Sequence, residues 1–431
     1  MRRPRAITYI TVGEDITSPL LRRQVLELLA AIKHQDPERK ITLVSFLGFH
    51  SIVILRKGIH EVRGSLKRAG IKLRIIPSLV PWPIPHFRFY KTDTGYRART
   101  WWSRGASNWL GTVVWPIMAY YSVVHRARVF HCRSYPAAYA AIRFKKLFSA
   151  TKVIFDPRSD FVEENVTAGK WAYGDKTFVF WKSAEGRILA SADAIACISP
   201  SHLRKYISIA PTSNYFTVPN NVDWERFRRV DDNRRSIRGQ WGVREDELVF
   251  CYLGALTSTG WHRADIYAHV CKAISATGIR CRFAFLTPPH GGNLLRNLLG
   301  DIGNSLILIS PPYEEVPKLL AGADYGLMFL DKRKLAVGTK IGEYLAAGLP
   351  LIANKNCIGA AELIEDKKVG HLVAMGLGDL DPSPGNLEQV GAVRGTALSE
   401  WSVRVSSFAR SYFDNTVIAS RYAEQYKVLG G

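Results

Sequence analysis

Short apolar runs of strand length alternate with helix-length segments along almost the whole chain. Such runs predict buried β-strands, and most neighbouring pairs flank a segment long enough for a helix. Repeated strand–helix–strand units imply right-handed crossovers and parallel sheets that helices cover on both faces. The predicted strands lie at 6–12, 41–47, 73–76, 129–131, 153–155, 194–198, 248–253, 283–286, 306–309, 325–329, 351–353 and 371–374. Predicted helices include 19–33, 262–276 and 314–320.

The strands fall into two series that meet in a basic, charge-mixed stretch near 223–247. This pattern predicts an α/β protein with two Rossmann-like, doubly wound parallel-sheet domains facing a cleft. We place the N-terminal domain at 1–205 and the C-terminal domain at 206–400. We expect 401–431 to form a crossover helix that packs back on the N-terminal domain. The apolar side of this predicted helix carries Phe408, Tyr412, Tyr422 and Tyr426.

Charge is unevenly distributed along the chain. The net charge of +22 comes almost entirely from residues 1–150, which hold 26 Lys and Arg against 7 Asp and Glu. Residues 151–431 hold 33 against 30. The first part therefore carries a field that attracts polyanions or an anionic membrane surface. No recognised nucleic-acid motif accompanies the charge, so we expect no specific nucleic-acid partner.

The segment 80–126 departs from the alternating pattern. Its first part interleaves aromatic residues with cations, and 105–125 then contain no Lys, Arg, Asp or Glu. That length approaches the ~20 residues that span a bilayer. Polar residues and Pro116 make it a poor membrane helix, so a buried helix is favoured over a membrane-dipping one. The flanking aromatic and basic residues are typical of an interfacial anchor. The predicted membrane-contact residues are Arg88, Arg97, Arg99, Trp101 and Trp102.

The cysteines and the N-terminal sequence favour a reducing compartment. The six cysteines are scattered, without a C-x-x-C or a Cys/His pattern of zinc-site spacing. Residues 1–15 lack the long apolar stretch and small-residue cleavage site of a signal peptide. We therefore expect a cytoplasmic protein that is peripheral at the cytoplasmic face of the membrane.

Several cofactor and catalytic motifs are absent from the sequence. It has no G-x-G-x-x-G after a strand, no G-x-x-x-x-G-K-[ST], no H-E-x-x-H and no G-x-S-x-G. A lone D-x-D, from Asp379 to Asp381, lies in a loop-like Gly/Pro stretch, and we interpret it as coincidence. We therefore expect neither a bound cofactor nor a metal ion.

Polar residues follow several predicted strands, at the ends where open α/β sheets bind ligands. Asp156, Arg158, Glu163 and Glu164 share one such loop. A second loop holds Arg133 and Ser134, and a third is a Gly/Ser/Thr loop after 248–253 whose backbone N–H groups could cradle phosphate. Taken one at a time, each residue fits a solvated loop better than a binding site.

The segment 340–354, K-I-G-E-Y-L-A-A-G-L-P-L-I-A-N, predicts a short helix, a Gly-Pro stop and a buried strand. A helix N-terminus offers free backbone N–H groups and the positive end of a dipole, so it can hold a phosphate. Gly338, Thr339 and Lys340 lie at this start. Glu343, one turn later, could accept both hydroxyls of a ribose. Capping alone also explains an isolated helix of this kind, so both interpretations stay open here.

Three motifs together resemble a known enzyme family. V-P-N-N-V-D at 218–223, the P-x-x-x-V-P-K-L-L-A-G-A-D-Y-G-L pattern at 312–327 and the segment at 340–353 follow in a fixed order. Their order and approximate spacing resemble the donor-binding domain of glycosyltransferase family 4, which has the GT-B fold. The first part is similar to a branch of that family through S-P-L at 18–20, H-C-R-S-Y-P at 131–136 and D-P-R-S-D-F-V-E-E at 156–164.

The resemblance implies a retaining glycosyltransferase that moves a sugar from a nucleotide-diphosphate donor on the C-terminal domain to an acceptor on the N-terminal one. A lipid-linked saccharide acceptor, as in bacterial cell-surface polysaccharide assembly, would suit the cationic first part. The implied donor residues are Gly254, Thr257, His262, Arg263, Gly338, Thr339, Lys340 and Glu343. The implied acceptor residues are Ser18, Arg133, Ser134, Glu163 and Glu164, the catalytic ones Asp156, Arg158 and Glu343, and the hinge residues Asn220 and Asn221.

The sequence departs from the family pattern at two positions. The first acid of the family's E-x7-E falls on Leu335, and a frequent arginine after the first strand of the second domain falls on Ala255. His262 with Arg263, or Lys334 with Lys340, are the candidates for the missing positive charge. The alternative to an active transferase is therefore a catalytically lapsed protein that binds a nucleotide or a partner without transfer.

Overall fold

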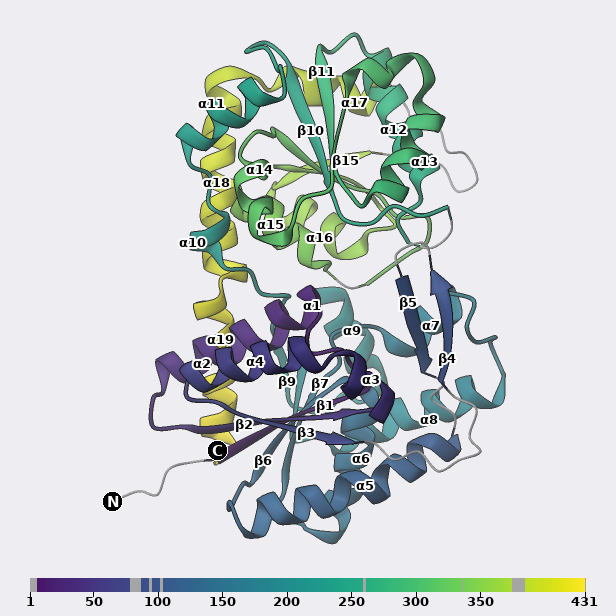
Figure 1. Ribbon diagram of the computed structural model, residues 1–431, viewed down its shortest axis with the longest axis vertical. Helices are drawn as coiled ribbons and strands as arrows, with labels where there is room; N and C mark the ends of the chain where they lie inside the picture. Colours follow the sequence, from purple (N-terminus) through teal and green to yellow (C-terminus); the bar gives the residue numbers. More distant parts are fainter. Residues whose placement is uncertain are drawn as a thin grey trace. The chain divides into compact units, whose positions relative to one another are not determined.

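The computed structural model describes residues 6–77, 87–92, 95–100, 104–258, 261–335, 337–373 and 384–430. The chain forms two compact units, Met1–Asn221 with Asn415–Gly431 as unit 1 and Val222–Asp414 as unit 2 (Figure 1). Unit 1 is thus built from two separate stretches of sequence, and unit 2 from one. The corresponding boundaries predicted from the sequence are 205/206 and 400/401.

Seven parallel strands form the sheet of unit 1 (Figure 1). The strand order reverses between β1 (Ala6–Val12) and its neighbour β6 (Val129–Arg133). Such a reversal leaves a ligand-binding crevice at the carboxyl ends of the strands. Of the seven strands in this sheet, only the three-residue β9 was not predicted from the sequence. In sheet order the strands are β3 (Lys72–Pro77), β2 (Lys40–Leu47), β1 (Ala6–Val12), β6 (Val129–Arg133), β7 (Lys152–Asp156), β8 (Ala194–Cys197) and β9 (Tyr215–Thr217).

Helices cover both faces of this sheet. One face packs through Phe46 and Phe130 on helices α5, α6 and α8. The other packs through Leu43 and Ile154 on α2, α4 and α19, and α19 lies against α2. The helical segments of unit 1 are α1 (Pro19–Leu21), the π-helical η1 (Arg22–Glu27), α2 (Leu28–Gln35), α3 (Phe49–Ile54), α4 (Arg56–Arg68), α5 (Arg104–Val123), α6 (Ser134–Leu147), α7 (Phe161–Thr167), α8 (Lys176–Ser191), α9 (Pro200–Ile209) and α19 (Asn415–Val428).

Unit 2 repeats the plan with six parallel strands, all of which were predicted. In sheet order they are β12 (Leu306–Ile309), β11 (Cys281–Leu286), β10 (Leu248–Leu253), β13 (Tyr325–Met328), β14 (Leu351–Asn354) and β15 (Gly370–Val373). Its helical segments are α10 (Trp224–Phe227), α11 (Asp231–Gln240), α12 (Ala264–Ala276), α13 (Pro289–Leu299), η2 (Gly300–Ser305), η3 (Tyr313–Glu315), α14 (Val316–Leu320), α15 (Thr339–Ala346), α16 (Ile358–Lys367), α17 (Pro384–Ala392) and α18 (Gly395–Phe413).

The tail contains two helices, where the sequence analysis predicts one crossover helix. α18 belongs to unit 2 and α19 to unit 1, with Asp414 between them. Tyr422 and Tyr426 are buried in the unit 1 core, so this part packs back on the N-terminal unit as the fold prediction states. Phe408 and Tyr412 pack instead on the core of unit 2.

The helix predicted to be buried at 105–125 is α5. Its Val114 and Met118 are buried in the core of unit 1, and the indole Nε1 of Trp115 donates a hydrogen bond to the Ala140 carbonyl at 2.9 Å. Within the described part of the chain, no helix is both long and apolar enough to cross a bilayer.

An antiparallel strand pair, β4 (Phe87–Thr92) with β5 (Gly95–Thr100), precedes this helix and was not predicted. The pair holds Arg88, Arg97 and Arg99, whose side chains lie outside the described part. Trp101 and Trp102 also lie outside the described residues.

Candidate functional site

At the carboxyl edge of the unit 2 sheet, the donor-motif helix begins where the sequence predicts. Gly338 has an extended backbone (φ −64°, ψ 150°), and α15 starts with Thr339 and Lys340. A glycine at this position has no side chain to occupy the first backbone N–H groups of the helix, which are the groups that could hold a phosphate.

Lys340 lies across the loop that follows β10. Its Nζ donates a hydrogen bond to the Tyr252 hydroxyl at 2.9 Å and stands 4.5 Å from the centroid of that ring. Gly254 makes room for it, because a Cβ there would come within 2.7 Å of the lysine Cε and Nζ, and the φ of +124° also requires glycine. The structure therefore brings Gly254 and Lys340 together, as predicted for a diphosphate site.

Glu343 is buried at 1% exposure and held in place by Tyr313. The Tyr313 hydroxyl donates to its Oε1 at 3.1 Å, and the Arg226 guanidinium lies 4.7 Å from the Tyr313 ring centroid. The carboxylate therefore has a defined orientation one turn into α15. Sequence reasoning missed Tyr313, which is 30 residues away along the chain.

His262 and Arg263, the first pair of candidates for the missing positive charge, are poorly suited to that role. Burial, with Lys340 and Lys334 nearby, lowers the pKa of His262 to about 2, so this ring is neutral near pH 7. Arg263 forms ion pairs with Asp265 and, at 3.1 Å, with Asp331. Lys340 and Lys334 are therefore the better candidates to meet a diphosphate.

Thr257 shapes the loop that carries these two residues. Its backbone N–H donates to the His262 carbonyl at 3.1 Å, and its own carbonyl accepts from the Ala264 N–H at 3.0 Å. These bonds close the turn that leads into α12.

A buried polar network fills the carboxyl edge of the unit 1 sheet. Arg158 Nε lies 2.9 Å from Asp156 Oδ1 and 3.0 Å from Oδ2, and its Nη2 donates to the Tyr422 hydroxyl at 2.9 Å. That hydroxyl donates to Asp156 Oδ2 at 3.0 Å. His131 joins through Nε2, 3.0 Å from Asp156, and through Nδ1, 2.6 Å from the Tyr426 hydroxyl. Helix α19 is thereby tied to the ends of β6 and β7.

The charges of this network are well defined. Burial raises the pKa of Asp156, but Arg158 and the hydrogen bond from His131 outweigh it, so the pKa lies well below its usual range. Burial lowers the pKa of His131 despite the carboxylate beside it. We therefore assign a neutral imidazole that donates from Nε2 to Asp156 and accepts at Nδ1 from Tyr426.

A second buried arginine lies at the same edge. Arg133 Nε is 3.0 Å from both carboxylate oxygens of Glu14, and its Nη2 donates to Gln24 Oε1 at 2.6 Å. Gln24 in turn donates to Asn220 Oδ1 at 2.7 Å. The predicted hinge residue Asn220 is therefore fixed within unit 1. Its neighbour Asn221 donates to the Arg23 carbonyl at 2.9 Å and to Asn415 Oδ1 at 2.6 Å, where the chain leaves and re-enters the unit.

The remaining predicted acceptor residues are placed separately. Ser18 caps α1, accepting from the Leu21 N–H at 3.3 Å. Ser134 begins α6 with a positive φ of 70°. Glu163 and Glu164 both lie in the first turn of α7, where Glu163 accepts from Lys182 at 3.1 Å. Within the described part of the chain, no group of three or more His, Cys, Asp or Glu is placed to hold a metal ion. The expectation of a metal-independent site stays a prediction.

Residues 247–380, which contain the donor-side edge just described, match the family of glycosyl transferases group 1. The matched stretch lies within unit 2. The match confirms the glycosyltransferase resemblance for the stretch that holds the motifs at 312–327 and 340–353, while assignment to family 4 stays a prediction. Among curated proteins, none matches the chain by sequence.

Solved structures extend the likeness to the whole chain. HepE of Anabaena, solved in complex with UDP, is 13% identical with a TM-score of 0.67, covering 98% of this chain and 100% of HepE. A glycosyltransferase of Rickettsia africae is 12% identical with a TM-score of 0.68, covering 99% and 98%. WaaB, a lipopolysaccharide outer core galactosyltransferase, is 13% identical with a TM-score of 0.62, covering 98% and 99%. These likenesses confirm the GT-B fold.

Proposed function

We propose that this protein is a retaining glycosyltransferase of bacterial cell-surface polysaccharide assembly. It transfers a sugar from a nucleotide-diphosphate donor to a saccharide acceptor that a lipid carries. The observation that carries the proposal lies at the start of α15, where Gly338, Lys340 and Glu343 follow one another and Lys340 stands beside Gly254, all within the stretch that matches the group 1 family. The UDP complex of HepE and the lipopolysaccharide role of WaaB support the donor and acceptor classes.

On unit 2, each part of this site has one task. Glu343 accepts the two ribose hydroxyls, and its bond from Tyr313 sets the direction of its carboxylate. Lys340 and the first N–H groups of α15 face the diphosphate. Negative charge grows on that diphosphate as the bond to the sugar breaks, so a fixed cation and fixed N–H donors favour the transition state over the bound donor.

On unit 1, Arg158 is the group that we propose to face the transferred sugar. Its Nε and Nη2 are held by Asp156 and Tyr422, whereas its buried Nη1 has no hydrogen-bond partner among the described residues. The network thus fixes the orientation of the Arg158 guanidinium and leaves its Nη1 available to a ligand. Arg133 repeats this arrangement, with its Nη1 also without such a partner.

A panel of nucleotide sugars tests the proposal. Release of the nucleoside diphosphate is measured with each donor in the presence of a lipid-linked saccharide, alongside titration calorimetry with the free nucleotides. We expect one donor to be turned over and its nucleotide to bind. A folded protein that binds none of the nucleotides would overturn the proposal.

The same experiment separates the catalytically lapsed alternative. Leu335, Ala255, the neutral ring of His262 and the ion-paired guanidinium of Arg263 favour that alternative. Nucleotide binding without any turnover across the donor panel would establish it. Turnover that depends on Lys340 would exclude it.

The lipid-linked acceptor also requires contact with a membrane surface. We propose peripheral attachment at the cytoplasmic face through the segment that holds Arg88, Arg97, Arg99, Trp101 and Trp102. Sedimentation with vesicles of anionic phospholipid should show binding that weakens when both tryptophans become alanine. An unaltered partition in that variant would place the anchor elsewhere.

A further inference from the structure

A pocket of about 580 Å³ opens at the amino edge of the unit 1 sheet, where the strands begin. The sites described above lie at the carboxyl edge of the same sheet and in unit 2. Seven residues of strand β1 separate the two edges of unit 1, which corresponds to roughly 20 Å. The pocket is therefore distinct from the proposed acceptor site.

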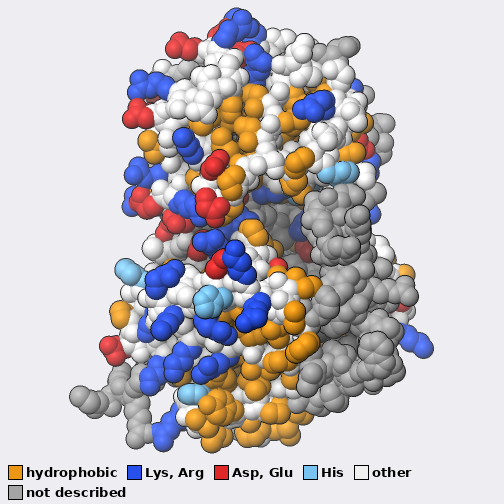
Figure 2. Space-filling model, in the orientation of Figure 1, with side chains coloured by type: hydrophobic (Ala, Val, Ile, Leu, Met, Phe, Trp, Pro, Cys, Tyr) orange, Lys and Arg blue, Asp and Glu red, His pale blue; other side chains and the backbone are white. Residues whose placement is uncertain are grey.

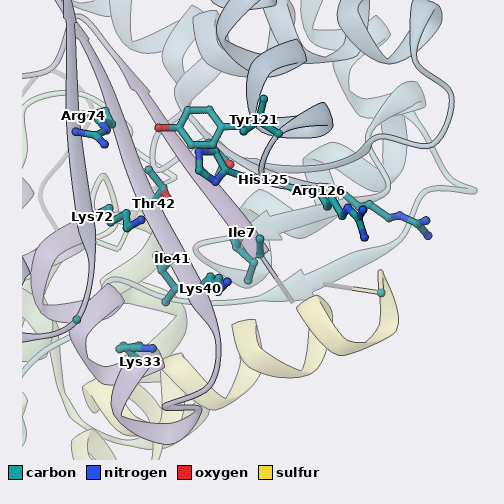
Figure 3. Close-up of a pocket in the computed structure, with 17 residues that line it drawn as sticks. Ile7, Lys33, Lys40, Ile41, Thr42, Lys72, Arg74, Tyr121, His125 and Arg126 are labelled. Atoms are coloured by element: carbon teal, nitrogen blue, oxygen red, sulfur yellow. The ribbon is translucent and has the colours of Figure 1, made fainter. Parts of the chain in front are cut away.

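Strand register explains the floor of the pocket. Thr8 pairs with Thr42, and Thr42 pairs with Lys72, so these three side chains form a row across β1, β2 and β3. Because side chains alternate along a strand, the row lies on the face that α5 and α6 cover further along. Near the start of the strands this face is open, and Tyr121 at the end of α5 forms part of the wall (Figure 3).

The lining carries one sign of charge. It contains no Asp or Glu, and its cations come from four separate parts of the chain. They are Lys33, Lys40, Lys72, Arg74, Arg126 and Arg128. Figure 2 shows Lys and Arg gathered over the same unit, with few acids between them.

Within the part of the chain that the structure describes, no carboxylate pairs with most of these cations. Among the described residues, Lys40, Lys72, Arg126 and Arg128 form no ion pair. Lys33 is held by the backbone carbonyls of Pro37 and Arg39, which fixes its position and leaves its charge. Like charges gathered around one cavity repel each other, and an anion in the cavity would relieve that repulsion.

A pair of stacked rings completes the pocket. The rings of Tyr121 and His125 stack with centroids 5.0 Å apart and stand beside Arg74 (Figure 3). The pocket therefore offers an aromatic wall together with its cations.

We propose that this pocket binds a compact anion that carries two or more phosphate groups. Lysine and arginine from several elements can contact separate phosphates, and guanidinium groups match phosphate oxygens in pairs. The volume lies within the range of small-ligand sites. Free polyphosphate and the diphosphate headgroup of a lipid share this chemistry, and the experiment below separates them.

Titration calorimetry with inorganic tripolyphosphate tests the proposal on the full chain. We expect binding that weakens about tenfold or more in Lys72→Ala/Arg74→Ala, since each removed charge-assisted contact carries a large share of the affinity. The matched control is Lys57→Ala/Arg63→Ala, which removes the same charge from exposed positions of α4. An equal loss of affinity in both variants would show that net charge alone attracts the anion, and it would overturn the proposed site.

A second variant guards against misfolding. Arg126 has a φ of +51°, a conformation that glycine adopts more easily. Arg126→Gly should therefore unfold no more readily than the natural protein and still bind tripolyphosphate several-fold more weakly. Unchanged binding in this variant would contradict the proposal.

Two further arms assign the anion. Glu343→Ala should keep tripolyphosphate binding, because the pocket lies in unit 1; loss in that variant would move the binding to the donor site and overturn the proposal. Vesicles that contain a polyprenyl diphosphate are then compared with vesicles of matched charge that lack it. Retention that depends on both the diphosphate and Arg126 assigns the lipid headgroup, whereas tripolyphosphate binding without such retention assigns a free ligand; both outcomes support the phosphate site.

Discussion

The carboxyl edges of the two sheets each hold an arginine paired with aspartate, but the pairs differ in burial. In unit 1 the side chains of Arg158 and Asp156 are 4% and 0% exposed. In unit 2 those of Arg263 and Asp331 are 31% and 29% exposed. A buried pair that loses one partner leaves an uncompensated charge, whereas water replaces a lost partner at a half-exposed pair. Breaking the charged pair should therefore cost more stability in unit 1 than in unit 2.

The largest expected effect comes from breaking the buried ion pair of Arg158 and Asp156. Asp156→Asn leaves Arg158 charged in the core and should lower the free energy of unfolding by about 3–5 kcal/mol. Asp331→Asn, the matched change in unit 2, should cost no more than about 1 kcal/mol, because Arg263 keeps Asp265 and is partly solvated. Urea denaturation of both variants measures the difference. Equal costs would show that burial does not distinguish the two edges.

Acid should destabilise both edges through neutral histidines, of which His131 is buried and His262 is partly buried. The folded-state pKa of His131 and His262 lies below the ordinary value, so the unfolded chain binds more protons as the pH falls below about 6.5. The stability that these rings contribute is complete above that pH and is lost as the pH falls. For His262, with a pKa of about 2, the loss between pH 6.5 and 4.5 should be on the order of 2–3 kcal/mol.

Unfolding curves at several pH values check this expectation. His262→Gln should flatten the pH dependence by about that amount. The same slope in the variant and the natural protein would mean that His262 is charged in the folded state.

Affinity for the donor nucleotide should depend on Glu343 at the carboxyl edge of the unit 2 sheet. Glu343→Ala should weaken binding of the donor nucleotide by about 10–100-fold, as expected for loss of hydrogen bonds to a charged group. Tyr313→Phe removes the bond that orients this carboxylate and should cost a smaller factor. Calorimetry with the free nucleotide measures both. Unchanged binding in Glu343→Ala would leave the carboxylate only a structural role in α15.

The smallest effect concerns the space beside Lys340. Gly254→Ala should displace the lysine from Tyr252 and cost about 1–2 kcal/mol in stability, with weaker nucleotide binding. Gly278→Ala is the control, because Gly278 also has a positive φ, of 76°, but a Cβ there meets nothing within 4 Å. It should share the backbone cost and bind nucleotide normally. Equal nucleotide affinity in both variants would separate Lys340 from the donor site.

Strands and donor motifs could be predicted because their signals are local. Apolar runs located the twelve longer strands of the two sheets, and the Gly-Lys-Glu spacing located α15. The sequence did not predict β9 or the antiparallel pair of β4 and β5. β9 has only three residues, and the pair is rich in polar residues. Contacts over long sequence distances were not predicted either. Tyr422 meets Asp156 across 266 positions, and its place on an apolar helix face gave no sign of that hydrogen bond.

Helix α19 has a consequence for the order in which the protein is made. The segment that folds into unit 2 leaves the ribosome as one continuous stretch and can close its core during synthesis. Unit 1 begins first but waits for α19, whose Tyr422 and Tyr426 complete the network around Asp156. Until then Arg158 and Asp156 lack hydroxyl partners, so the nascent first unit should depend on chaperones longer than the second.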